Sequence, residues 1–148
     1  MARGDLTVFE EFSKQIGDSE HDFQSDVLKA GIVDATITPA ASDASPTWGD
    51  YSANEVSSDG GYVAGGLTLA SVTYTEVGGV ATLDATDISI IQDASGFTDG
   101  YWVIIYNDTN GTDMAIAFVD LDGPVSEVAG PITISWNASG IATVTVTP

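Results

Sequence analysis

The chain has 148 residues, and 3 Lys and Arg against 22 Asp and Glu give it a formal net charge of −19 at pH 7. There is no Cys, which excludes disulfides, thiolate catalysis and cysteine-ligated metal centres. A chain of this length fits one domain and buries roughly 68–70% of its unfolded surface without a covalent or metal staple. No apolar run approaches the roughly 18 residues of a membrane helix, and the N-terminus lacks the apolar stretch of a signal peptide, so we expect a soluble chain with no membrane partner.

The basic residues are confined to the beginning of the chain: Arg3, Lys14, His21 and Lys29. Residues 30–148 contain 15 Asp and Glu but no Lys, Arg or His, so we expect no salt bridge within the body of the chain. Its carboxylates must be solvated, capped by hydrogen bonds, bound to cations or matched by basic groups of another chain. Because a phosphate backbone is held by Lys and Arg, we expect no nucleic-acid partner. High solubility and a basic partner surface both explain the excess of acid.

The first predicted element is a short helix over Val8–Ile16, because Thr7 and Glu10 have the spacing of a capping box. Its apolar face is formed by Phe9, Phe12 and Ile16. A helix of about nine residues does not persist alone in water, where roughly 12–15 residues are already marginal. The face must therefore dock on the body or on a neighbouring molecule. We predict residues 1–22 as an N-terminal arm in which Arg3 and these apolar side chains make the contact.

Residues 23–148 are predicted to form an all-β body, a mostly antiparallel β-sandwich or barrel-like single domain, because alternating or apolar runs are separated by turn residues. Outside the central hairpin the predicted strands are Val27–Val33, Leu67–Thr75, Val80–Leu83, Ile88–Ile91, Ile132–Trp136 and Ala142–Thr147. Gly78-Gly79 permits a tight hairpin between the second and third of these. The last two alternate strictly on either side of Asn137–Gly140, so we predict a final hairpin with one buried and one solvated face.

A long irregular stretch covers residues 39–66 and has no sustained period. Loops longer than about 12–15 residues inside a compact domain usually have a function. Three aromatic residues lie in it: Trp48, Tyr51 and Tyr62. Aromatic side chains in a loop serve as core plugs, as platforms that stack on sugars or as contact anchors for another protein. All three interpretations remain open, and these residues are candidates for an interface.

The segment Tyr101–Leu121 is predicted to be the central hairpin. Tyr101–Tyr106 is apolar at every position, Met114–Val119 repeats the pattern, and Asn107–Asp113 supplies turn residues between them. Asp120–Pro124 is predicted as the following turn. A strand that is solvated on one face alternates apolar with polar residues, so this pair is covered on both faces. The second cover is either part of an ordinary β-sandwich or a subunit interface.

Two acidic loops were natural candidates for calcium, but neither has the EF-hand pattern. With Gly111 or Gly123 at the sixth position, the first and twelfth positions hold no ligand residue. Irregular calcium sites at Asp108/Asp113 or Asp120/Asp122 are the alternative. We predict no metal-binding residue.

No constellation indicates catalysis. His21 lies among three carboxylates in residues 18–22, where a solvated acidic loop is favoured over a metal site because adjacent side chains diverge. It is also the only base available to a Ser-His-Asp triad, and its segment is polar. Among 22 acids no particular pair stands out as a glycosidase pair. We predict that the protein is not an enzyme, with no catalytic residue and no cofactor.

Several segments together resemble small virion structural proteins of tailed bacteriophages. They are the opening MARGDLTVFEEFSKQIGD, the middle PTWGDYSANEVSSDGGYVAGGLTLASVTYT, and the late ASGFTDGYWVIIYNDT, AIAFVDL and ITISWNASGIATVTV. The resemblance covers most of the chain. It lies in the order of these segments and in their residues, with no catalytic signature.

The resemblance implies a cement or decoration protein of the phage head that stabilises the shell by binding the major capsid protein and neighbouring copies of itself. Such a protein is a homo-oligomer, is assembled in the host cytoplasm and has no cofactor. A tail or connector component is the near alternative. A carbohydrate-binding β-sandwich module is the competing class, because loop aromatics and acidic side chains serve that function equally well.

Overall fold

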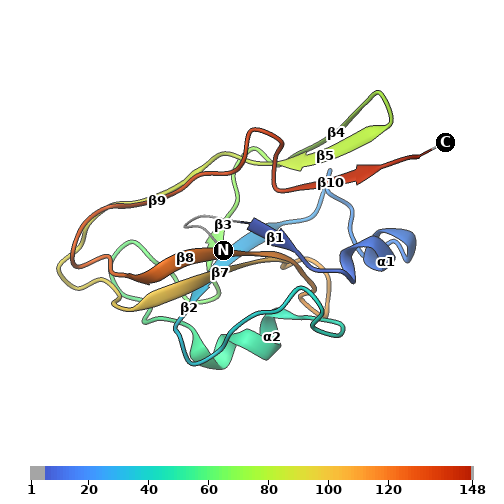
Figure 1. Ribbon diagram of the computed structural model, residues 1–148. Coiled ribbons are helices and arrows are strands. Elements are labelled where there is room, and N and C mark those ends of the chain that lie inside the picture. The colour runs from blue at the N-terminus through green and yellow to red at the C-terminus, as the bar shows by residue number, and fades with distance from the viewer. Residues whose placement is uncertain (1–5, 148) are drawn as a thin grey trace.

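The computed structural model describes residues 6–147. Its largest sheet has five strands in the order β1-β8-β7-β2-β3, and every neighbouring pair is antiparallel. These strands are β1 (Leu6–Val8), β2 (Leu28–Val33), β3 (Leu67–Thr68), β7 (Gly100–Asn107) and β8 (Ala115–Val125). The predicted central hairpin is therefore present as β7 and β8, with β7 in the middle of the sheet (Figure 1).

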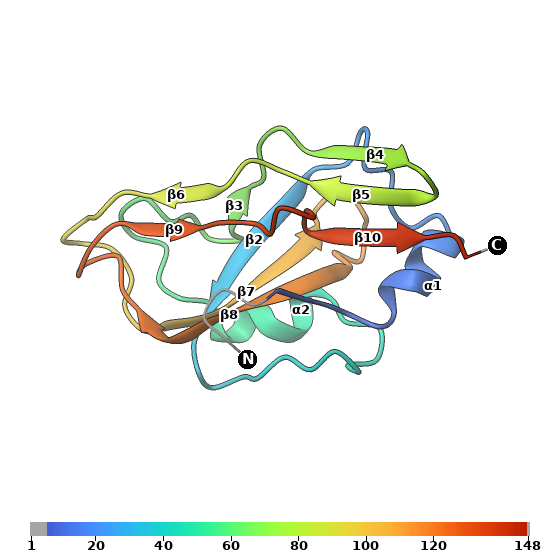
Figure 2. The same cartoon turned by 45° about the horizontal axis from the view of Figure 1, so that its top comes forward.

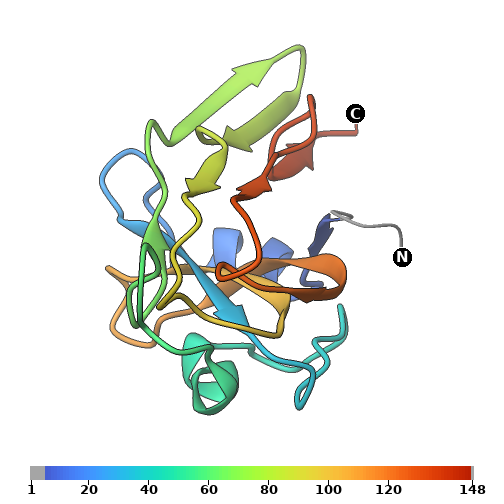
Figure 3. The same cartoon turned by 90° about the vertical axis from the view of Figure 1, so that its left-hand side faces the viewer.

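A second layer covers one face of this sheet. It consists of a three-stranded sheet in the order β10-β5-β4 and a two-stranded sheet of β6 and β9, again all antiparallel. The strands are β4 (Thr73–Val77), β5 (Val80–Asp84), β6 (Ile88–Ile90), β9 (Ile132–Ile134) and β10 (Ala142–Thr145). Figures 2 and 3 show the two small sheets end to end above the large one. The prediction of an all-β, mostly antiparallel fold is confirmed.

The helices are short. They are α1 (Phe12–Gly17), α2 (Trp48–Tyr51) and the 3₁₀ turn η1 (Ser52–Asn54). None of the helices between residues 6 and 147 has the length and apolar character that crossing a membrane requires.

The main core lies between the two layers. Val103 and Ile105 of β7 are completely buried there, in one cluster with Leu83 of β5, Ile90 of β6 and Ile134 of β9. The cluster draws side chains from both layers, so the layers are held together chiefly by apolar burial.

The other face of the large sheet is covered by residues of the same chain. Ile104 and Tyr106 of β7 lie in a second buried cluster with Phe9, Trp48 and Tyr51. The indole of Trp48 stacks on the ring of Tyr106, with the ring centroids 5.0 Å apart and the planes 2° from parallel. Helix α2, which carries Trp48, lies beneath the sheet in Figure 1. The hypothesis that a subunit interface covers this face is therefore wrong, because the cover is intramolecular.

The N-terminal helix is shorter and begins later than predicted. Leu6–Val8 forms β1, which pairs with β8, and α1 begins at Phe12. The predicted capping box is therefore wrong: the residue before the helix is Glu11, and its side chain makes no capping hydrogen bond. Leu6 and Val8 pack against the main core from the edge of the sheet. Here pairing and burial override the local helical signal.

Two predicted strand arrangements are also wrong. Leu67–Thr75 is divided at Ser71, whose φ is 53°, into β3 and β4, which belong to different sheets. The last two strands do not form a hairpin with each other, because β9 pairs with β6 and β10 pairs with β5. The chain between them runs onward along the second layer (Figure 2). Strict alternation specifies which face of a strand is buried, and it leaves the partner strand open.

The predicted turn Asp120–Pro124 lies inside β8. Asp122 and Gly123 have φ values of 55° and 103°, and the register with β7 shifts between Gly100 and Trp102. The turn residues thus produce an irregularity in a long strand, which is the effect of a β-bulge.

Gly31 tests the intramolecular cover of the large sheet. A Cβ at this position would lie 2.3 Å from the Trp48 indole, whereas a Cβ at Gly111 would meet nothing within 4 Å. We expect Gly31→Ala to lower the free energy of unfolding by about 1–3 kcal/mol, because overpacking displaces the ring. Gly111→Ala should stay within about 0.5 kcal/mol of wild type. Urea denaturation measures both, and equal effects would show that Trp48 does not hold this face.

Candidate interaction groove

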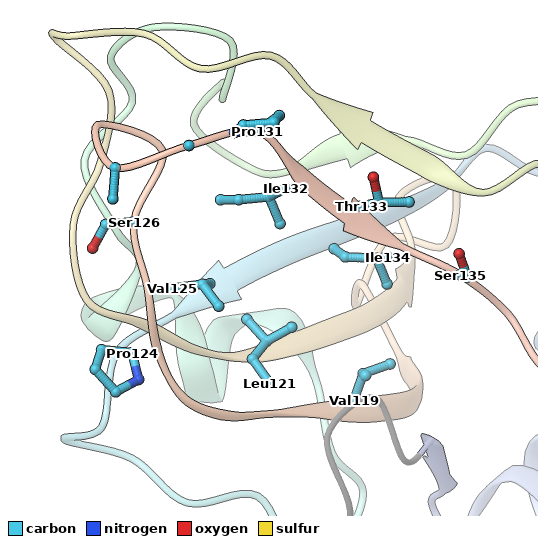
Figure 4. A pocket seen from close by; sticks show the side chains of 12 residues that line it. Val119, Leu121, Pro124, Val125, Ser126, Pro131, Ile132, Thr133, Ile134 and Ser135 are labelled. Carbon is cyan, nitrogen blue, oxygen red and sulfur yellow. The ribbon is translucent and has the colours of Figure 1, made fainter.

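An open groove runs along one side of the sandwich, where β8 and β1 of the large sheet face β9 and β10 of the second layer. It consists of two cavities of about 600 Å³ and about 470 Å³, and Ser135 lines both. Figure 4 shows the walls of the larger cavity, where apolar side chains of β8 and β9 approach each other: Val119, Leu121, Val125, Ile132 and Ile134. The apolar walls of the larger cavity thus belong to the main core.

The smaller cavity lies beneath the segment that joins β9 to β10. Leu6 and Val8 of β1 form one wall, and Trp136 belongs to the other. The indole N–H of Trp136 donates to the Thr86 carbonyl at 3.0 Å, and its backbone N–H donates to the Asp87 carboxylate at 3.0 Å. These two hydrogen bonds fix the Trp136 side of the smaller cavity.

The chemistry of the groove suits binding. Its lining contains apolar side chains, Gly, Pro, Ser, Thr and Asn, and no titratable side chain of residues 6–147. β1 and β10 are edge strands, and β9 pairs with β6 alone. The open edges of β9 and β10 above an apolar floor offer main-chain donors and acceptors together with side-chain pockets, which is how proteins take up an extended segment of a partner.

The predicted contact residues of the N-terminal arm lie mostly inside the folded chain. Phe9 is 1% exposed and Phe12 is 4% exposed, and Ile16 is partly buried against the main core. Arg3 lies outside the described residues. The apolar face that we expected to dock is thus already docked on the body, and in this conformation it offers no free contact surface.

The loop aromatics are core plugs. Trp48, Tyr51 and Tyr62 are all buried. The Tyr62 hydroxyl accepts a hydrogen bond from the Ile32 N–H at 2.8 Å and donates to the Glu55 carboxylate at 2.7 Å. Burial, reinforced by that carboxylate, raises the pKa of the Tyr62 phenol above its ordinary value, so it remains a neutral donor. Of the three interpretations of these residues, the structure shows the first.

The acidic loops that were alternative calcium sites are engaged in other contacts. Asp108 forms a salt bridge at 3.0 Å with Lys29, which directly precedes the span of residues 30–148 for which no internal ion pair was expected. Asp120 accepts a hydrogen bond from the Asp122 N–H at 2.7 Å. Between residues 6 and 147 no cluster of three or more His, Cys, Asp or Glu side chains has the geometry of a metal site.

His21 belongs to a polar network that joins the segment after α1 to the β7–β8 turn. Its Nε2 lies 2.9 Å from the Gln15 side-chain oxygen, and its Nδ1 lies 3.0 Å from the Asn107 amide nitrogen. Gln15 and Asn107 are themselves buried. The Asn107 amide is a donor, so Nδ1 must accept, and the proton is on Nε2. The neutral ring fits this arrangement, and a second proton on Nδ1 would face a donor.

The groove could not be identified from the sequence. Its walls come from β1, β8, β9 and β10. Where the sequence indicates one of these strands, it does so only through the pattern of neighbouring residues. The groove exists because β9 pairs with β6 and β10 with β5, so that neither crosses to β8. That pairing has no local signal.

The sequence matches no protein-family model, and no curated protein or solved structure resembles the chain closely enough to count as a match.

The single imidazole makes the His21 network directly testable. Burial lowers the pKa of His21 below its ordinary 6.5, against the opposing charges of Asp26 and Glu20. The unfolded chain therefore takes up this proton at a higher pH than the folded one. The contribution of the neutral ring to stability is complete above about pH 6.5 and is lost as the pH falls through the folded pKa.

We expect NMR titration of the folded chain to give a His21 pKa below 6.5, with nitrogen shifts of the Nε2–H tautomer at neutral pH. The same chain in urea is the control and should titrate near the ordinary value. A folded pKa above that of the urea control would show that the two neighbouring carboxylates outweigh burial.

Proposed function

We propose that this chain is a structural protein of a tailed-bacteriophage virion, a cement or decoration protein of the head that binds the major capsid protein. The observation that carries the proposal is the neutral groove with open strand edges, set in a body that has no basic side chain from residue 30 onward. The resemblance of its segments to small virion proteins supports the same function. In this proposal the protein reaches the head after synthesis in the host cytoplasm.

The groove supports a contact function because it combines a fixed shape with neutral walls. Val119, Ile132 and Ile134 are nearly completely buried, so the walls are part of the core and are not free to rearrange. A preformed site loses little conformational entropy when it binds. A protein that stabilises a shell needs this property, since its binding free energy must be available to hold its neighbours in place.

Charge supports a basic or mixed-charge partner. At −19, two copies of the chain repel each other, and a surface that carries Lys and Arg attracts them. Contacts between neighbouring copies on a shell must therefore use neutral surfaces such as the groove, or be bridged by the capsid protein. The proposal includes both contacts, with the capsid protein as the principal partner.

The competing functions have less support. The three loop aromatics are buried in the core, so they provide no platform on which a sugar ring could stack. A tail or connector component would use the same groove and charge, and fractionation of the particle distinguishes it from a head protein.

Particle fractionation is the direct test. We expect the chain to co-sediment with assembled heads in stoichiometric amount and to be absent from separated tails. Its presence in tails alone would support the tail or connector alternative, and its absence from both would refute a virion function.

Two arginine variants test the groove. Ser135 lines both cavities, and Ser89 is also an exposed serine, in β6 and outside the lining. We expect Ser135→Arg to weaken binding to heads at least about tenfold, because a charge in a desolvated contact is costly. Ser89→Arg adds the same charge and should bind as wild type. Equal binding by both variants would remove the groove from the proposal while leaving the fractionation result intact.

A further inference from the structure

Glu127 is a carboxylate buried without a complete set of partners. The residue is 0% exposed and follows β8, in the segment that leads to β9. Its Oε1 accepts a hydrogen bond from the Gly61 N–H at 2.5 Å. Its Oε2 is also buried, and no hydrogen-bond donor among residues 6–147 reaches it.

No basic side chain of the chain's described part is available to neutralise it. Residues 30–148 contain none. The two described lysines pair with other acids, Lys14 with Asp18 and Lys29 with Asp108, and the His21 ring is held between Gln15 and Asn107. A buried carboxylate with neither a counter-charge nor a full set of donors carries a large free-energy cost. A cation supplied from outside the chain would satisfy Oε2 and neutralise this charge.

The surroundings of Glu127 are built to hold it. Three glycines from two loops pack against the Glu127 side chain. A Cβ would lie 2.6 Å from the nearest Glu127 atom at Gly60, 3.1 Å at Gly61 and 2.6 Å at Gly96. Any larger residue at Gly60 or Gly96 would displace the side chain. Gly60 also has a φ of 70°, which glycine adopts without strain. The sequence thus leaves room for this one acid where three loops meet.

Other oxygen-bearing groups are close by. The Cβ of Asp93 lies 3.0 Å from the position that a Gly60 Cβ would take, and Glu127 Oε1 lies 2.6 Å from the same point. The main-chain carbonyl oxygen of Ile91 lies 3.9 Å from the corresponding point at Gly61. Asp93 is exposed, and its Oδ1 accepts a hydrogen bond from the Ser95 N–H at 2.8 Å. The side chains of Glu127 and Asp93 and one main-chain carbonyl therefore border the Gly60–Gly61 pair.

We propose that Glu127 and Asp93, with main-chain oxygen of the 91–93 segment and water, bind a calcium ion that ties together the loops around Gly60, Gly96 and Glu127. Calcium accepts carboxylate and carbonyl oxygens in flexible numbers and geometry, whereas magnesium demands a near-ideal octahedron and retains its waters. Because only two acidic side chains take part, the site differs from the clusters of three or more His, Cys, Asp or Glu side chains that are absent from residues 6–147. The proposal does not depend on the function of the groove.

Calcium titration of the whole chain is the test. We expect a saturable response at millimolar or lower calcium, as in sites with few carboxylates. The amide signals of Gly60, Gly61 and Gly96 in a ¹H–¹⁵N spectrum should shift together, and the melting temperature should rise with the same midpoint. Magnesium at equal concentration and ionic strength should give a clearly smaller effect. Shifts spread evenly over all the acidic loops would indicate diffuse screening and overturn the proposal.

Asp93→Asn is the decisive variant, because Asn keeps the Oδ1 acceptor for Ser95 and removes one charged ligand. We expect its calcium affinity to fall at least about tenfold. Asp122→Asn removes an equal charge from an exposed position in the irregular part of β8 and should leave the affinity unchanged. If both variants bind calcium like wild type, the site is wrong.

Glu127→Gln gives an independent readout in calcium-free buffer. If calcium neutralises the wild-type carboxylate, the variant should be at least as stable as wild type without calcium and should gain nothing when calcium is added. A variant that folds and still shows the glycine shifts would overturn the assignment. If it does not fold, the Asp93 and Asp122 pair decides alone.

Discussion

The burial of β7 on both faces is the constraint on which the rest of the structure depends. Val103 and Ile105 face the second layer, and Ile104 and Tyr106 face α2. Each such side chain contributes roughly 1.5–3 kcal/mol when fully buried, so neither face is left open without a large loss. The chain must supply two covers. One is a layer of short strands, and the other is a single helical turn with the aromatic residue Phe9.

The helical cover is not stable by itself, and it explains two features of the sequence. A helix of four residues has no independent stability, so α2 persists because Trp48 stacks on Tyr106. Gly31 in the neighbouring strand is required because the indole occupies the space of its side chain. The long stretch from residue 39 to 66 is therefore a structural cover for the central sheet. Its aromatic residues are explained by packing, without a ligand.

The sequence predicts what periodicity and turn chemistry determine locally. The strand predicted at Val27–Val33 is found as β2, Leu28–Val33, and the Gly78-Gly79 turn is found with φ values of 61° and 85° at the two glycines. The double burial of β7 was also predicted, but the identity of its second cover was not, since an apolar face does not say what lies on it. The same limit explains the wrong final hairpin and the missed groove. Glu127 gave no signal at all, because its burial comes from the meeting of three distant loops.

The acidity of the body is part of its architecture. Where a chain with more Lys and Arg would pair its acids, this one directs many of them at its own main-chain N–H groups in turns. Asp34 accepts from Thr36, Glu55 from Gly65, and Glu76 from Gly79, at 2.7, 2.7 and 2.6 Å. Such bonds fix irregular backbone without a cation. Removing acids to reduce the net charge would therefore loosen the turns between the strands, so the negative surface and the fold cannot be altered independently.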